Sequence, residues 1–492
     1  MHDDEVLISA GPTETVIADA TGAASVIRGQ ERSADGGRAA DRRGQWSWAL
    51  FEGARDPNVL FQIYIISPFF VTVMMHDAVR GQELWLDTTT WGGILTAIFA
   101  PFMGAIADKG GPRKPWLALF VTLMVISFAG TWVGVPNSSA FQIYFVAGMV
   151  VLNNTVFEFS NAFHGAMLSG IAPTRKIGGL SGLAYALGNG SGFLLLVFFF
   201  IAFAAPGRLH ASFIPEHTLF GVNQAAHEPE RLSGPITAVW MLLLAIPLFL
   251  YTPDRPRGAL PAREVLRQGI GSVVRTVRSL GHYRNIAHYL GARTLFNDGM
   301  SGVLTVIGIY AAGTFGFGAL EMSLLGIELT IFATLGGLFG GWIDDRLGSR
   351  NALLISIGGT TVFFALSLMQ APDRIFWFWH ADAQALLPIP FFNTWPKILY
   401  LVLSDLMAVC IVAGYANSRS MMARMAPPEK MTEFFGLMSL SGSAATFLAP
   451  FSVSWMTYWT HSQLGGVLAI VPFLAAGFIW MFWVKEERAT AV

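Results

Sequence analysis

Long apolar runs recur along the chain, separated by short polar connections. About twelve of them approach the roughly 20 residues that an α-helix needs to cross the hydrocarbon core of a membrane. They are too long and too continuous for the roughly 10-residue alternating strands of a membrane β-barrel, so each predicts a helix. The expected spans are 57–75, 91–107, 116–135, 141–164, 178–204, 235–251, 286–312, 320–343, 352–369, 398–417, 434–458 and 465–484.

Composition supports a membrane protein and excludes several partners. Of the 492 residues, 53% are hydrophobic and only 13% charged, and the net charge is −1. Binding to nucleic acid needs an excess of Lys and Arg, so that partner is excluded. The single cysteine, Cys410, lies in an apolar run, which rules out a disulfide framework or a cysteine-based zinc site within one chain. We expect no metal and no cofactor.

The segments outside the spans differ in composition. Residues 1–45 are polar and lack the apolar core of a signal peptide, which predicts a disordered cytoplasmic tail. Residues 253–285 combine many arginines with apolar positions at helical spacing, which predicts an amphipathic linker on the inner leaflet; a docking surface for a soluble partner is the alternative. Residues 485–492 form a short second tail. In the expected topology, most Lys and Arg lie on the same side of the membrane as the N-terminus. Basic residues are enriched on the cytoplasmic side, so both termini are expected in the cytoplasm.

Two loops reveal an internal repeat. GAIADKGGPRK at 104–114 and GWIDDRLGSRN at 341–351 share the pattern G-x-x-x-D-x-x-G followed by basic residues. A second pair, IAPTRKIGGLSG at 171–182 and MAPPEKMTEFFG at 425–436, repeats in the same register. We therefore predict a duplicated unit: one six-helix bundle at 46–252 and a second at 286–484, joined by the basic linker.

This repeat resembles the major facilitator superfamily, whose members carry such a loop after the second helix of each half. The motifs WSWALFEGARDP (46–57), FSNAF (159–163), LSGLAYALG (180–188), FNDG (296–299) and NSRSMMARMAP (417–427) look like its vacuole-effluxer-like branch of amino-acid effluxers. The resemblance implies an all-α polytopic fold of twelve transmembrane helices and latching of the two halves by the loops. The implied gating residues are Gly104, Asp108, Gly111, Arg113, Gly341, Asp345, Arg346, Gly348 and Arg350. Where the branch usually shows Tyr-Asp and Ala-Asn, this chain has a charged helix 1 entrance: Glu52, Arg55 and Asp56.

The stretch LFNDGMSG (295–302) places polar residues inside an expected span. A charged side chain at the bilayer centre costs roughly 2.5 to 3.5 kcal/mol, so Asp298 is expected to face the bundle interior or a watery cavity. Asn297 offers amide donors and a carbonyl acceptor, and Asp298 can exchange a proton or pair with an amine. We interpret both as contacts for a substrate or a coupling ion. The alternative is a helix break in which Asn-Asp-Gly caps or bonds to a neighbouring helix.

Other ionisable residues within expected spans are further candidates. Arg293 lies one helical turn before Asn297 and either binds a carboxylate of the solute or neutralises one of the protein. Glu328, Glu158 and Asp405 are candidates for coupling to protons or for binding the solute. Arg419 is interpreted as a cytoplasmic latch or topology residue, and His164 as a structural histidine.

These observations predict a secondary transporter that works by alternating access. No phosphate loop G-x-x-x-x-G-K-[ST], H-E-x-x-H or G-x-S-x-G motif is present, which argues against an ATP-driven pump and an intramembrane hydrolase. The expected partners are a small solute, protons and the lipid bilayer, and a monomer in a bacterial inner membrane is expected. Amino-acid export follows from the resemblance. Transport of a sugar or another small metabolite, uniport, and a non-transporting sensor stay open.

Overall fold

The computed structural model describes most of the chain. The described residues are 7–9, 14–18, 24–28, 32–75, 81, 84–85, 87–88, 90–96, 98–99, 102–103, 111–207, 212–255, 281, 283–315, 317, 319–381, 392–443 and 448–487. Most of the amphipathic linker expected at 253–285 therefore lies outside the described residues. The gating residues Gly104 and Asp108 lie outside them as well.

The helices of the N-terminal half, here called the N-half, follow the expected spans closely. They include a series of π-helical turns in the first and fifth expected spans. Their bounds are α1 Arg42–Arg55, α2 Pro57–Phe61, η1 Gln62–Ile66, α3 Ser67–Phe69, η2 Phe70–Met74, α5 Lys114–Gly130, η3 Thr131–Val133, α6 Ala140–Ile171, η4 Thr174–Lys176, α7 Ile177–Phe199, η5 Phe200–Ala204, η6 Leu219–Gly221, η7 Gln224–Ala226 and α8 Glu228–Tyr251.

The C-terminal half, here called the C-half, follows the same order. The span expected at 434–458 comprises two helices, α14 and α15, on either side of residues 444–447, which lie outside the described set. The bounds are α10 Arg284–Phe315, α11 Ala319–Leu347, α12 Ser349–Leu368, β4 Arg374–Ile375, β5 Trp379–His380, α13 Trp395–Met425, η8 Pro428–Lys430, α14 Met431–Ser443, α15 Leu448–Thr460, α16 Gln463–Leu468 and α17 Val471–Met481.

Eight of the described helical stretches are long and apolar enough to cross a membrane, and each coincides with an expected span. Of the other four expected spans, 434–458 is divided as described above, and the remaining three have local reasons to differ. Residues 57–75 are divided by π-helical turns, and 91–107 are only partly described. Residues 286–312 carry the ionisable side chains of Arg293 and Asp298.

The first helix begins earlier than expected. The side chain of Asp41 accepts a hydrogen bond from the backbone N–H of Gly44 at 2.7 Å, which satisfies one of the free donors at a helix start, so α1 begins at Arg42. The WSWALFEGARDP motif is therefore helical, and the side chains of Trp48 and Phe51 are fully buried. The expected entrance lies inside the protein.

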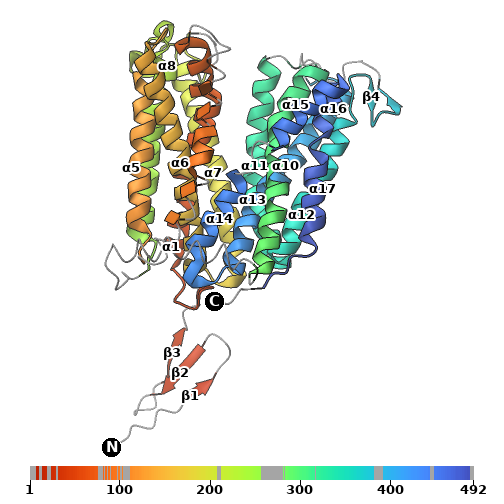
Figure 1. Ribbon diagram of the computed structural model, residues 1–492. Helices are drawn as coiled ribbons and strands as arrows, with labels where there is room; N and C mark the ends of the chain where they lie inside the picture. Colours follow the sequence, from red (N-terminus) through yellow and green to blue (C-terminus); the bar gives the residue numbers. More distant parts are fainter. Residues whose placement is uncertain are drawn as a thin grey trace, which may run out of the picture.

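The N-terminal segment also contains regular structure. Three short strands, β1 Leu7–Ser9, β2 Glu14–Ala18 and β3 Ala24–Arg28, form an antiparallel sheet in the order β1-β2-β3. Residues 33–41 then lie across the end of α6, where the backbone N–H of Ala34 donates to the carbonyl of Ala172 at 2.9 Å. Figure 1 shows the small sheet below the helical body.

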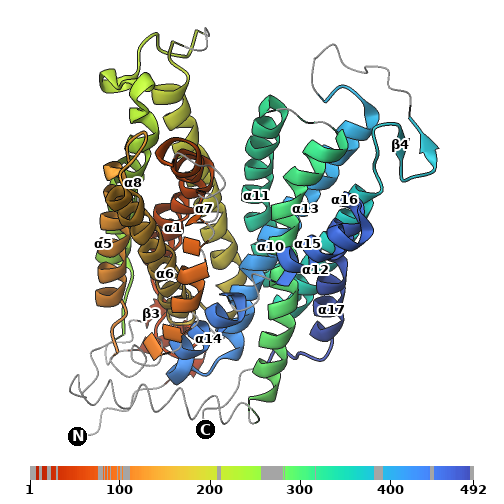
Figure 2. The ribbon, with the colours of Figure 1, turned by 45° about the horizontal axis from the view of Figure 1, so that its top comes forward.

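The two halves lie side by side and come together at one end (Figures 1 and 2). We call this the latch end; it carries Arg113 and Gly348, from which α5 and α12 begin. There α7 of the N-half packs against α11 of the C-half through glycines. A Cβ added at Gly182 would lie 2.2 Å from the carbonyl oxygen of Gly337 and 2.7 Å from the Cα of Gly341. The backbones touch, as small residues allow between membrane helices.

Candidate functional site

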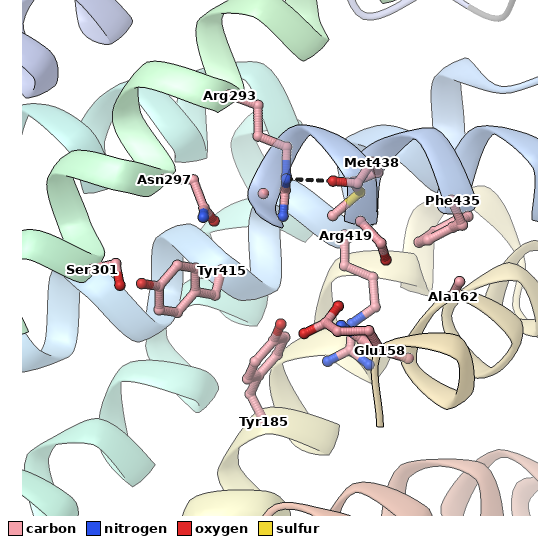
Figure 3. Close-up of a pocket in the computed structure, with 13 residues that line it drawn as sticks. Glu158, Ala162, Tyr185, Arg293, Asn297, Ser301, Tyr415, Arg419, Phe435 and Met438 are labelled. Atoms are coloured by element: carbon pink, nitrogen blue, oxygen red, sulfur yellow. Dashed lines mark hydrogen bonds between the residues drawn. The ribbon is translucent and has the colours of Figure 1, made fainter. Parts of the chain in front are cut away.

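A polar cavity of about 300 Å³ lies between the two halves (Figure 3). Helices α6 and α7 form its N-half wall, and α10, α13 and α14 form its C-half wall. Its lining residues are Glu158, Asn161, Ala162, Tyr185, Arg293, Asn297, Ser301, Tyr415, Arg419, Phe435, Met438, Ser439 and Gly442. The position between bundles is where ligand sites form in transporters built from repeats.

Arg293 supplies a fixed positive charge to the C-half wall. Its Nε donates to the Ser418 hydroxyl at 3.1 Å, and its Nη1 donates to the Met438 carbonyl at 2.7 Å and the Ser441 hydroxyl at 2.9 Å. The side chain is buried, and no described carboxylate lies within ion-pair distance of it. Three neutral acceptors thus orient the guanidinium, and the carboxyl group of Glu158 on the opposite wall interacts with it electrostatically from beyond ion-pair distance.

Glu158 supplies a carboxyl group from the opposite wall. It lies on α6 beside Asn161, is half-buried, and points into the cavity (Figure 3). Within the described part of the chain no Lys or Arg forms an ion pair with it. Apart from Arg419, which pairs with Glu52, the cavity lining therefore has one cationic and one anionic side chain, contributed by different halves and each without an ion-pair partner among the described residues.

The LFNDGMSG stretch divides between the cavity and the bundle interior. Asn297 and Ser301 line the cavity. Asp298, which is 1% exposed, is directed instead toward α15, where its Oδ2 accepts a hydrogen bond from the backbone N–H of Ala449 at 2.8 Å. Its Oδ1 has no hydrogen-bond partner among the residues that the structure describes. Asp298 thus satisfies a donor in the first turn of α15, as a capping residue does.

The charged residues of α1 form a buried cluster with α13. Glu52, which is 1% exposed, forms ion pairs with Arg55 on its own helix and with Arg419 of the C-half. Arg55 also lies 3.6 Å from Asp56. Two carboxylates and two guanidinium groups therefore balance one another, which offsets the cost of burying each.

A histidine and a tryptophan hold the N-half side of this cluster. The Nε2 of His164 donates to the Trp48 carbonyl at 2.8 Å, and the Trp48 indole N–H donates to the His164 carbonyl at 2.9 Å. The rings stack at 4.3 Å. The Nδ1 of His164 then faces Glu52 at 3.6 Å. His164 is fully buried and positions α1 on α6.

Glu328 and Asp405 meet between α11 and α13, away from the cavity. Their carboxyl groups face each other, and Asp405 is 5% exposed. Neither residue is part of the cavity lining.

Asp345 joins the two halves at the latch end. Its Oδ2 accepts from the backbone N–H of Gly179, at the start of α7, at 2.8 Å. A carboxylate at a helix N-terminus is favoured by the free N–H groups and by the helix dipole. The neighbouring Asp344 pairs with Arg424 at 2.7 Å, within the C-half.

The matching N-half loop reaches the equivalent place in the C-half. The Nε of Arg113 donates to the hydroxyl of Thr432, in the first turn of α14, at 2.9 Å. Both loops thus contact the first turn of a helix in the other half, as the internal repeat requires. Gly111 and Gly348 have the positive φ angles, 93° and 81°, that these turns use.

The remaining predicted loop residues make contacts within the C-half or between the two halves. Gly341 packs on Gly178, with a built Cβ 2.8 Å from the Gly178 carbonyl oxygen. The guanidinium of Arg346 lies 4.1 Å from the Trp342 ring. The Nη2 of Arg350 donates to the Phe482 carbonyl at 3.0 Å, which ties α12 to the end of α17.

Comparisons with known proteins agree with this architecture. Residues 92–491 match the family described as Vacuole effluxer Atg22 like. The chain is 21% identical over 456 residues to the uncharacterized MFS-type transporter YxiO of Bacillus subtilis, covering 91% of this chain and 96% of that protein. A structure of the MFS transporter FucP in the outward conformation has a TM-score of 0.65 at 13% identity, covering 90% of this chain and 99% of that one. The proton:xylose symporter XylE gives 0.63 at 12%, covering 91% and 96%.

Two helical bundles of this fold around a central polar cavity define a secondary transporter of the major facilitator superfamily, an integral multi-pass membrane protein and not an enzyme. Within that class, the chain belongs to the Vacuole effluxer Atg22 like family. The predicted all-α fold and the predicted branch are confirmed.

Several cavity residues escaped the sequence reasoning. Arg419, interpreted as a latch residue, also lines the cavity, with Tyr185 and Tyr415. Aromatic residues are frequent in every span, so nothing in the sequence singled out these two tyrosines. The signal for Arg419 was available: an arginine within the NSRSMMARMAP motif, near the end of an apolar run, with a glutamate in the first helix as its partner.

Proposed function

We propose that this protein transports amino acids by alternating access, with Arg293 holding the carboxylate and Glu158 holding the ammonium group of the solute. The observation that carries this proposal is the presence of these two unpaired, opposite charges in one cavity between the halves. Charge-assisted hydrogen bonds of this kind are the strong ones in a binding site.

The charge balance of the site favours a zwitterion. Glu52, Arg55, Asp56 and Arg419 neutralise one another, which leaves one cation and one anion free in the cavity. A zwitterionic solute neutralises both groups, whereas a simple anion or a simple amine leaves one of them buried without a counter-charge. That residual burial is costly in a membrane protein.

The placement of the two groups gives a mechanism for coupling. Arg293 belongs to the C-half and Glu158 to the N-half, so a bound amino acid bridges the halves. Bridging stabilises the state in which the cavity walls are closest. Binding energy is then available for the rearrangement that moves the access path from one side of the membrane to the other.

The proposal includes the orientation of the protein in the membrane and the groups that couple transport to protons. With the N-terminus in the cytoplasm, the latch end is cytoplasmic and the structure corresponds to a state closed on that side. Asp298 and the Glu328–Asp405 pair are the proton-coupling groups, since each is buried in the C-half next to the elements that form the cavity wall. Export of amino acids against a gradient, with protons as the driving ion, is the proposed direction.

A polyol is the second candidate solute. Asn161, Asn297, Ser301, Tyr185 and Tyr415 give the cavity the amides, hydroxyls and aromatic faces that sugars bind, and FucP and XylE are symporters of sugars. A sugar offers no charged group to pair directly with Arg293 or with Glu158, so the zwitterion is preferred.

Counterflow in proteoliposomes tests the proposal. Vesicles loaded with a mixture of the twenty amino acids are exposed to trace labelled amino acids, and a parallel set uses fucose and xylose. We expect counterflow of amino acids that is lost in Arg293→Gln and in Glu158→Gln. Counterflow of sugars alone, or amino-acid counterflow unchanged in both variants, contradicts the assignment. An imposed pH gradient then compares wild type with Asp298→Asn and Glu328→Gln: loss of accumulation with counterflow intact identifies the coupling group.

A further inference from the structure

Within the described part of the chain, the side chains that contact the Arg419 guanidinium belong to the opposite half. Arg419 lies on α13 of the C-half, but its recorded partners are the ion pair with Glu52, the Tyr185 ring at 4.2 Å and the Trp48 ring at 5.5 Å. All three belong to the N-half. The head group is therefore inserted into a slot of the N-half and has to leave that slot when the halves separate at this depth.

Arg419 also has unused hydrogen-bonding capacity toward the cavity. It is 2% exposed, and its Nε and Nη2 find no hydrogen-bond acceptor among the described residues. A guanidinium carries five N–H donors, and a buried donor without an acceptor is unfavourable. Since Arg419 lines the cavity, an anionic group there can accept from it.

The two arginines of the cavity are physically connected. Ser418, which precedes Arg419 on α13, accepts a hydrogen bond from the Nε of Arg293 at 3.1 Å and bonds to the Tyr289 hydroxyl at 2.7 Å. A carboxylate bound at Arg293 therefore lies on the same wall as Arg419. Glu52, for its part, keeps Arg55 as a partner when Arg419 leaves, so neither group of the slot is left without a counter-charge.

We propose that Arg419 exchanges its bond to Glu52 for a bond to the carboxylate of the solute, and that this exchange releases the halves at the latch end. The inference rests on the proposed function in one respect, the carboxylate of the solute. It assigns Arg419 as a ligand-operated switch: the pair with Glu52 favours closure of the empty transporter at the latch end, and solute from the cytoplasm binds and stabilises the open state, in which Arg419 is free of Glu52. No covalent change is involved.

A cysteine reporter tests this exchange. Thr432→Cys, in a Cys410→Ser background, places the only thiol at a fully buried position of the latch end. Its labelling by a charged thiol reagent on purified protein reports separation of the halves there. Labelling is measured without solute and with the mixture of twenty amino acids, in the parent and in the variants Glu52→Gln, Arg419→Gln and Arg419→Lys. Asp345→Ala is the matched control, because it removes a different contact between the halves, the one to the Gly179 N–H, and does not line the cavity.

An exchange of partners at Arg419 predicts a distinct pattern of labelling rates. Amino acids accelerate labelling of the parent; Glu52→Gln labels about tenfold faster without solute, since the buried pair is gone. Arg419→Gln is equally fast and no longer responds to amino acids, and Arg419→Lys, which keeps the charge without the planar fork, responds partly. Asp345→Ala is fast but still responds. A full response in Arg419→Gln, or parental labelling in Glu52→Gln, overturns the proposal.

Failure of the proposed function gives a different pattern. If amino acids are not the solute, they change neither labelling nor counterflow in the parent, even though Glu52→Gln labels fast; this overturns exchange with an amino acid. If counterflow is present and Arg419→Gln keeps the response, only the role of Arg419 is wrong.

Discussion

Replacing Gly182 by alanine is predicted to force the halves apart at the latch end. The added Cβ would lie 2.2 Å from the carbonyl oxygen of Gly337 and 2.7 Å from the backbone of Gly341. All the opposing atoms are backbone atoms, so no side-chain rotation relieves the overlap. Because Gly182 lies on α7 and its neighbours on α11, the strain falls on the contact between halves and not within one bundle.

The size of the effect follows from the geometry. An ordinary contact distance is at least 3.4 Å, so the two helices must move apart by roughly 1.2 Å at this point. Overpacking of a well-packed contact typically costs about 1 to 3 kcal/mol. If that cost applies only to the state closed at the latch end, the equilibrium shifts toward the open state by roughly 5- to 150-fold.

Labelling of the Thr432→Cys reporter measures this shift. Gly182→Ala is expected to raise the labelling rate while the melting temperature stays close to that of the parent. Two other glycines provide controls. Gly148→Ala meets no atom within 4 Å and is expected to change neither quantity. Gly336→Ala overlaps the Val409 backbone within the C-half, 2.6 Å away, and is expected to lower the melting temperature without raising labelling. Unchanged labelling in Gly182→Ala would refute the close contact between α7 and α11.

Three further predictions concern single carboxylates. Asp345→Ala removes the acceptor for the Gly179 N–H and is expected to speed reporter labelling by about fivefold, as for loss of a helix cap worth about 1 kcal/mol; Asp345→Asn, which keeps an acceptor, should restore much of the closure. Asp298→Asn keeps a carbonyl for its backbone partner on α15, so melting should stay near the parent while proton-driven accumulation is lost; Asp298→Ala should lower the melting temperature as well. Asp35→Ala removes a partner 3.8 Å from Arg255 and is expected to change labelling by less than about threefold, because a partly exposed pair at this distance contributes roughly 0 to 1 kcal/mol.

The fold was predictable because its signals are long and repeated. An apolar run of membrane-spanning length has few alternatives to a helix, and a loop motif that occurs twice in register fixes the pairing of the halves. The start of α1 was missed because its buried face includes Glu52, Arg55 and Ser47, which a hydropathy pattern assigns to water. Burial there depends on partners from α6 and α13, far away in the sequence.

The site was predictable only in its residue types. The sequence identified polar positions within spans, but the direction of a side chain depends on helix rotation, which packing sets. Asn297 and Asp298 are adjacent, so they point about 100° apart on a helix, and only Asn297 lines the cavity. Glu158 matched no motif, yet it is the acidic residue that lines the cavity. Pairs such as Glu52 and Arg419 need a three-dimensional structure to be recognised.

Direct binding with matched solute analogues tests the central claim most directly. Affinities of the purified protein are measured for an amino acid that gives counterflow, for its amide, which lacks the carboxylate, and for the amine that lacks the carboxyl group altogether. The account predicts that Arg293→Gln weakens the amino acid by roughly 10- to 150-fold, as for a charge-assisted hydrogen bond of about 1.5 to 3 kcal/mol, and has little further effect on the amide. Glu158→Gln should weaken all three, since each keeps its ammonium group. Equal affinities of parent and both variants for the amino acid would contradict the proposed site.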